Sequence, residues 1–155
     1  MEIKFQKMTP SGYQKIKDEI DQLNNDRPHK IKELQVARSK GDLSENAEYS
    51  AAKRDLRHLE SRLRFLKRQL RYAQVIKPED NGKIDIGTTV SLRFDDDGDD
   101  ETYRIVGKQE VDVDQDMISF ESPLGKALME HEAGDTVTVK APASTYKVTI
   151  TKVAL

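Results

Sequence analysis

Two carboxylates in the N-terminal half of the chain have the types and spacing for metal chemistry. Asp42 and Glu45 stand three residues apart in the segment 41–46. Mg²⁺ prefers hard oxygen ligands and usually takes only one or two protein carboxylates, keeping several waters. Two acids therefore cannot build a complete site, but they can complete a partner's site, where a metal ion activates water or stabilises a leaving oxygen. Ser44 and Asn46 can support such a site by hydrogen bonding.

The same spacing has a structural interpretation. An acid followed three residues later by Glu forms a capping box at a helix start, with Asp42 at the N-cap and Glu45 at the third helical position. Both acids would also complement the positive end of the helix dipole. Spacing alone favours capping, and both interpretations stay open at this point.

The strongest periodic pattern of the chain predicts a helix over residues 47–75. Apolar or small residues recur there at alternating spacings of three and four, as in the a/d seam of a coiled coil. Such a helix would be roughly 43 Å long. The seam positions are Tyr49, Ala52, Leu56, Leu59, Leu63, Leu66, Leu70 and Ala73.

A partner helix is predicted over residues 12–38. Thr9 is suited to be its N-cap and Pro10 its first residue. Pro28 lies inside the pattern and should bend the helix or open a turn. We expect one long helix with a kink near Pro28.

The connection between the two helices is short. Gly41 can end the first helix in the left-handed conformation, and Asp42 or Ser44 can start the second. So short a connection makes the helices antiparallel. The acids are therefore predicted at the tip of a helical hairpin.

The second half of the chain changes to period-two alternation, which predicts strands. The predicted division is a coiled-coil hairpin over 1–77, a linker over 78–82 and a small, mostly β domain over 83–155, an α+β chain. Strands are predicted at 89–94, 103–106, 117–120, 136–139 and 146–150, with an acidic turn at 95–100 and a short helix within 122–129.

Composition sets further limits. The chain has 155 residues and no Cys, which excludes disulfides and Cys-based zinc sites. No apolar run is long enough to span a membrane and the first residues do not read as a signal peptide, so we expect a soluble cytoplasmic protein without a membrane partner. The net charge of −2 hides a basic first half and an acidic second half, which indicates two surfaces with different partners.

The segment Gly41-Asp42-Leu43-Ser44-Glu45-Asn46-Ala47-Glu48-Tyr49 resembles the signature of the GreA/GreB family of bacterial transcript-cleavage (transcription elongation) factors, closer to GreA. Weaker resemblances lie in the expected order along nearly the whole chain. They are Met8–Gly12, Leu23–Pro28, Ala51–Lys53, Glu60-x-Arg62, Ala73–Ile76, Tyr103–Gly107, Ile118-Ser119, Ser122–Leu128 and Gly134-Asp135.

The resemblance implies an FKBP-like β domain and binding at the secondary channel of bacterial RNA polymerase. It implies that Asp42 and Glu45 support Mg²⁺ held by the polymerase, not stably by the isolated protein, during cleavage of backtracked nascent RNA near its 3′ end. It places Ser122 and Pro123 in the polymerase-binding surface. The chain would then be a cofactor of the polymerase's own cleavage and not an enzyme, and we expect a monomer.

A basic stripe on the second helix is a further candidate site. Arg57 and Arg64 lie seven residues apart on a solvent-facing side of the predicted coiled coil. Exposed arginines beside aromatic residues can hold single-stranded nucleic acid. We expect contact with RNA or with the polymerase channel, and the alternative is a solvated helix face.

Three other functions stay open. A paralogue of the same family can bind the channel and regulate or inhibit without cleaving. A prolyl isomerase would fit the implied fold, but fold does not imply function. A coiled-coil chaperone or scaffold would need apolar surface at the tip, where only Leu43 is apolar. The aromatics available for a proline pocket in the β domain are Phe94, Tyr103, Phe120 and Tyr146.

Overall fold

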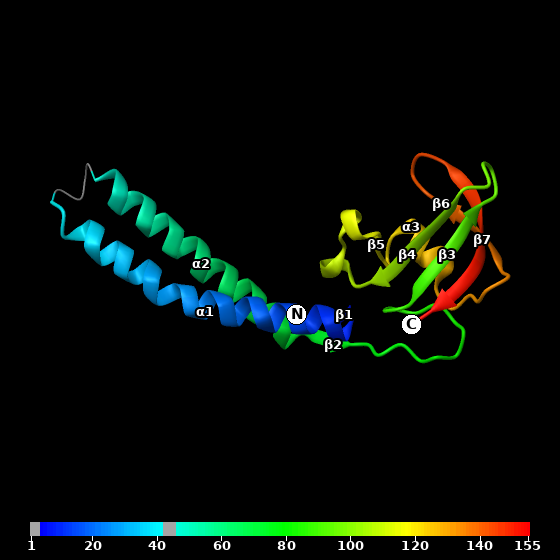
Figure 1. Cartoon of the computed structure of the whole chain (residues 1–155), viewed down its shortest axis with the longest axis horizontal. Coiled ribbons are helices and arrows are strands. Elements are labelled where there is room, and N and C mark those ends of the chain that lie inside the picture. The colour runs from blue at the N-terminus through cyan, green and yellow to red at the C-terminus, as the bar shows by residue number, and fades with distance from the viewer. Residues whose placement is uncertain (1–3, 42–45) are drawn as a thin grey trace. The chain divides into compact units, whose positions relative to one another are not determined.

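The computed structural model describes residues 4–41 and 46–155, and it divides into two compact units (Figure 1). One unit is Tyr13–Tyr72, and the other combines Met1–Gly12 with Ala73–Leu155. The N-terminal segment thus belongs to the same unit as the β domain.

The first unit is a hairpin of two long helices, α1 (Pro10–Arg38) and α2 (Ala47–Arg71). Two ion pairs fix their direction, because Glu19 pairs with Arg62 at 2.8 Å and Arg27 pairs with Glu60 at 3.1 Å. The later residue of α1, Arg27, pairs with the earlier residue of α2, Glu60. The helices are therefore antiparallel, as predicted.

The predicted seam of α2 forms the core of the hairpin. Leu59, Leu63 and Leu66 are buried against Ile20 of α1. Arg57 and Arg64, which lie off the seam, are exposed. The three–four spacing of the sequence therefore identifies the face of α2 that packs on α1.

The start of α1 is also as predicted. Pro10 is its first residue, and the Oγ1 of Thr9 accepts a hydrogen bond from the backbone N–H of Gly12 at 3.0 Å. The helix continues through Pro28 up to Arg38, so no turn opens at the proline.

The predicted end of the second helix is wrong. Helix α2 ends at Arg71, and Ala73–Val75 form strand β2, which pairs in parallel with β1 (Gln6–Met8). The N–H of Ile76 extends this ladder to the carbonyl of Met8 at 2.8 Å. Local periodicity predicted too long a helix because the pairing partner of Ala73 is Gln6, 67 residues earlier in the sequence.

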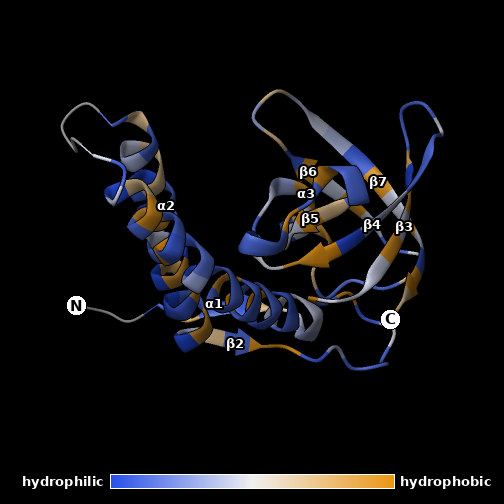
Figure 2. Ribbon diagram, turned by 60° about the vertical axis from the view of Figure 1, so that its left-hand side comes forward, coloured by the Kyte–Doolittle hydropathy of each residue, from blue (hydrophilic) through white to orange (hydrophobic). Residues whose placement is uncertain are grey.

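The β domain contains a five-stranded sheet in the order β5-β4-β3-β7-β6. Only β4 and β5 run parallel, and the other neighbours are antiparallel. Figure 2 shows hydrophobic residues gathered in these strands, while α1 is mostly hydrophilic. The strands are β3 (Thr89–Phe94), β4 (Asp100–Val106), β5 (Met117–Ser119), β6 (Thr136–Lys140) and β7 (Thr145–Ala154).

The five predicted strands and the acidic turn are confirmed to within a few residues. Alternate side chains of β3 and β7, among them Val90, Leu92 and Val148, are fully buried in one core. The predicted short helix is α3 (Pro123–Leu128), which adds Leu128 to that core. Two 3₁₀ turns, η1 (Lys108–Glu110) and η2 (Val113–Gln115), lie between β4 and β5. The predicted architecture, a helical hairpin followed by a curled, mostly β sheet, is confirmed.

Among the described residues, no helix combines the length and apolar character that crossing a membrane requires.

Candidate functional site

Three of the predicted tip residues, Asp42, Ser44 and Glu45, lie outside the described residues. Their neighbours on both sides are described. Gly41, three residues beyond the end of α1 at Arg38, has a φ of 120°, in the positive region that favours glycine. Asn46 immediately precedes α2. The two candidate acids therefore belong to the connection between α1 and α2.

Asn46 joins the two helix ends. Its side-chain oxygen accepts a hydrogen bond from the backbone N–H of Tyr49 at 3.0 Å, which makes Asn46 the N-cap of α2. Its Nδ2 donates to the carbonyl oxygen of Ala37, in the last turn of α1, at 2.8 Å. Nearby, Lys40 pairs with Glu48 at 3.1 Å. The base of the tip is thus tied by one amide and one ion pair.

The expectation that Asp42 or Ser44 starts the second helix is wrong, and so is the capping box built on Asp42. The helix begins at Ala47 with Asn46 as its cap. Asp, Ser and Asn are all good N-caps, so type alone cannot choose among three of them in five residues. Asn46 is the one that also reaches the carbonyl of Ala37. Capping α2 therefore does not account for the Asp-x-x-Glu spacing.

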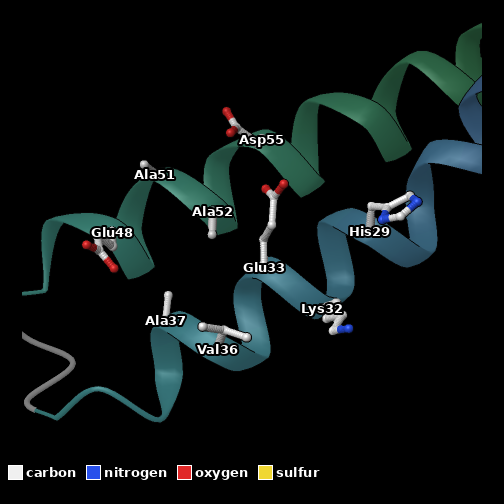
Figure 3. Close-up of a pocket in the computed structure, with 9 residues that line it drawn as sticks. All are labelled: His29, Lys32, Glu33, Val36, Ala37, Glu48, Ala51, Ala52 and Asp55. Carbon is white, nitrogen blue, oxygen red and sulfur yellow. The ribbon is translucent and has the colours of Figure 1, made fainter.

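A hollow of 530 Å³ lies on the hairpin beside the tip (Figure 3). Small side chains, Ala37 and Ala52, form its buried floor. The carboxylate of Glu33 points from α1 toward α2, and Asp55 and Glu48 border the hollow from α2. Acidic side chains from both helices therefore border this hollow, together with Lys32 and His29.

The candidate arginines lie farther along α2 and are exposed. Neither Arg57 nor Arg64 forms an ion pair with any residue that the structure describes. Arg64 borders a second hollow, of 370 Å³, together with Arg27 and Lys67. Phe65, next to Arg64, is 42% exposed. The Cζ atom of Arg62 lies 5.3 Å from the centroid of its ring. Arg57 and Arg64 are thus exposed cations without an ion-pair partner among the described residues, and the ring of Phe65 is accessible beside Arg64.

Ser122 and Pro123 form the start of α3. The Oγ of Ser122 accepts from the N–H of Gly125 at 3.1 Å and donates to the carbonyl of Ser119 at 2.6 Å. Pro123 is the first helical residue and is exposed. Ser122 thus has a structural role as an N-cap, while Pro123 presents its ring to solvent.

A metal cluster and a proline pocket are two other kinds of site on which the described residues bear. No group of three or more His, Asp or Glu side chains within 4–41 and 46–155 is placed to hold a metal ion. The four aromatics considered for a proline pocket pack against the core of the β domain, with the rings of Phe94 and Tyr146 5.8 Å apart. Burial raises the pKa of Tyr103, with smaller effects of nearby charges such as that of Glu101.

Two family models together match most of the chain. The model described as "Transcription elongation factor, N-terminal" matches residues 6–75, and "Transcription elongation factor, GreA/GreB, C-term" matches residues 79–155. These two ranges correspond to the segment from β1 to β2 and to the rest of the β domain.

Curated relatives match over nearly their whole length. Transcription elongation factor GreA 1 of Lactiplantibacillus plantarum is 53% identical over 150 residues, covering 97% of this chain and 96% of the relative. GreA of Thermodesulfovibrio yellowstonii is 41% identical, covering 95% of each. Among solved structures, GreA factor homolog 1 (Gfh1) of Thermus thermophilus has a TM-score of 0.45 at 23% identity, covering 98% of this chain and 100% of that one.

Proposed function

This chain belongs to the GreA/GreB family of transcription elongation factors, and we propose that it stimulates RNA polymerase to cleave its own backtracked nascent RNA. In this proposal it binds as a monomer at the secondary channel of bacterial RNA polymerase and rescues arrested complexes in the cytoplasm. The chain activates the polymerase's endonucleolytic cleavage and is not itself an enzyme.

The two acids of the tip carry the proposed chemistry. Carboxylates are the hard oxygen donors that Mg²⁺ prefers, and one or two of them suffice when water and a partner supply the rest. Mg²⁺ in the polymerase would supply activation of water and stabilisation of the leaving oxygen. Asp42 and Glu45 would hold that ion and its waters from the side of the channel. The isolated chain is expected to bind Mg²⁺ only weakly.

One observation supports this proposal over a purely structural role for the acids, namely that Asn46 caps α2. The cap position that Asp42 would need for a capping box is already filled. Asn46 also ties the start of α2 to Ala37, in the last turn of α1.

Two further surfaces are assigned roles in the proposal. Arg57 and Arg64 are exposed, lack ion-pair partners among the described residues, and would contact the RNA or the channel wall. Pro123, exposed at the start of α3, would contact the polymerase, with Ser122 holding the turn in place.

The proposal is tested with bacterial RNA polymerase stalled in a backtracked state on 5′-labelled RNA. Adding the protein with Mg²⁺ should shorten the labelled transcript, and polymerase alone should do so much more slowly. Binding to the polymerase without any shortening would instead identify a channel-binding regulator. Absence of binding would contradict the proposal altogether.

A further inference from the structure

One carboxylate in the β domain accepts hydrogen bonds from Thr9, the residue that precedes α1. The two oxygens of Glu110, in η1, accept from the backbone N–H of Thr9 at 3.2 and 3.1 Å. The hydroxyl of Thr9 donates to the same carboxylate. The N–H of Gly107 donates to it at 2.8 Å. One side chain thus joins residues 101 positions apart in the sequence.

This joint leaves no space for other side chains. A Cβ on Gly12, in the first turn of α1, would come within 2.7 Å of the Cγ of Glu110 and still closer to its carboxylate. A Cβ on Gly107 would collide with the backbone carbonyl of Lys7. Thr9, at 1% exposed, is sealed inside. Both glycines are therefore required for the close approach of the two segments.

Two exposed contacts support the same joint from its rim. Nη2 of Arg104, on β4, donates to the hydroxyl of Ser11 at 3.3 Å. The ammonium of Lys7 lies 5.8 Å from the ring centroid of Phe120. Thr9, the residue before α1, is thus held to Glu110 by partly buried, charge-assisted hydrogen bonds, which are stronger than neutral ones.

We infer that Glu110 is a positioning residue for transcript cleavage, because it fixes Thr9 and the first turn of α1, the start of the helix that leads to the tip. This inference rests on the proposed function. Helix α1 is continuous from the joint at Pro10 to Arg38, at the base of the tip. Glu110 therefore acts at a distance, by clamping the first turn of α1 on the β domain, and it does not touch RNA or metal.

The joint matters because the rate of cleavage depends on how accurately the reacting groups are placed. A displacement of a reacting group by about 1 Å can lower a rate by roughly 100-fold. A loose joint leaves the polymerase-binding residues and the tip acids unchanged, but it no longer fixes the start of the helix that leads to the tip. Loss of the joint should then lower the cleavage rate more than the affinity for polymerase.

The test uses Glu110→Ala in the full chain, with Asp114→Asn as the matched control. Asp114 is an exposed acid in the neighbouring turn η2 whose side chain has no part in the joint. At saturating factor, Glu110→Ala should cleave backtracked RNA roughly tenfold more slowly or worse, with less than about a threefold change in affinity for polymerase. The backbone amides of Thr9 and Gly107 should exchange hydrogen faster, because both donate to Glu110.

A disulfide provides the rescue that separates positioning from general damage to the fold. In Gly12→Cys/Glu110→Cys the two Cβ atoms would lie no more than about 4.2 Å apart, within the range of roughly 3.5–4.5 Å found in disulfides. The chain has no other Cys, so only this bond can form. The oxidised protein should regain most of the wild-type cleavage rate, and the reduced protein should behave like Glu110→Ala.

The outcomes distinguish this inference from the function on which it rests. If wild type fails to stimulate cleavage, the proposed function is wrong. If wild type cleaves and Glu110→Ala cleaves equally fast at saturation, or the oxidised and reduced double variants do not differ, Glu110 does not position the tip.

Discussion

The amide of Asn46 donates to the carbonyl oxygen of Ala37 at 2.8 Å while its oxygen accepts from the N–H of Tyr49, so that one side chain joins the end of α1 to the start of α2. The two bonds can be separated by substitution. Asp at position 46 keeps the acceptor that caps α2 but loses the donor to Ala37, whereas Ala loses both.

We predict that Asn46→Ala destabilises the hairpin by about 1 kcal/mol or somewhat more, the usual cost of losing an N-cap. Asn46→Asp should retain the cap and most of that stability. Urea titration followed by helical circular dichroism measures both. If Asp is as harmful as Ala, the bond to Ala37 dominates over the cap. If neither change lowers the stability, Asn46 does not hold the two helix ends together.

Removal of the two exposed arginines of α2 should weaken binding to a backtracked complex. Replacing Arg57 and Arg64 by Ser removes two cations, so fewer counterions are displaced and the dependence of affinity on salt becomes flatter. The matched control replaces Lys147 and Lys152, two exposed cations of β7, by Ser. Affinities across a salt series that are unchanged for the arginine variant, or changed equally by the control, would contradict RNA or channel contact at these positions.

Ser122 and Pro123 should differ in the way they affect polymerase binding. Pro123→Ala changes only an exposed ring, so the β domain should keep its thermal midpoint while affinity for polymerase falls. Ser122→Ala removes the cap of α3 and should also destabilise the domain by about 1 kcal/mol. Binding isotherms and thermal melts on the same samples separate the two effects. Wild-type affinity in Pro123→Ala would remove this surface from the proposal.

Asp135 should make a stabilising contribution that depends on pH. A hydrogen bond from the N–H of Glu132, and then the contact with His131, hold the pKa of Asp135 below its ordinary value of 3.8. A lowered pKa means that the contribution is present above that value and is lost as the pH falls through the pKa of the folded state. Asp135→Ala should therefore melt at a lower temperature than wild type near pH 7, with the gap closing below about pH 4. A gap that persists undiminished in acid would show that the charge is not its origin.

The parts of the fold that local sequence patterns could predict are those with local causes. The seam from Tyr49 to Leu70 and the alternation in β3 and β7 reflect burial of one face, which repeats with the period of the element. The N-cap at Thr9 and the helix start at Pro123 follow from residue type. These features were predicted to within a few residues.

What the sequence did not show depends on partners distant along the chain. Strand β2 replaces the predicted last turns of the second helix because β1 pairs with it. Nothing near Glu110 indicates that its carboxylate accepts from Thr9. The choice of Asn46 over Asp42 and Ser44 as the cap also required a contact across the hairpin, to Ala37. Asp42 and Glu45 were selected by type and spacing, and their role stays a prediction.

The role of the tip acids in RNA cleavage is tested most directly by comparing wild type with Asp42→Ala and Glu45→Ala on backtracked polymerase carrying 5′-labelled RNA. Binding is measured on the same complexes. We predict that wild type shortens the RNA and that both variants bind with near wild-type affinity but leave the RNA uncut. Variants that cut as fast as wild type would contradict it, because the acids of the tip would then have no part in the chemistry.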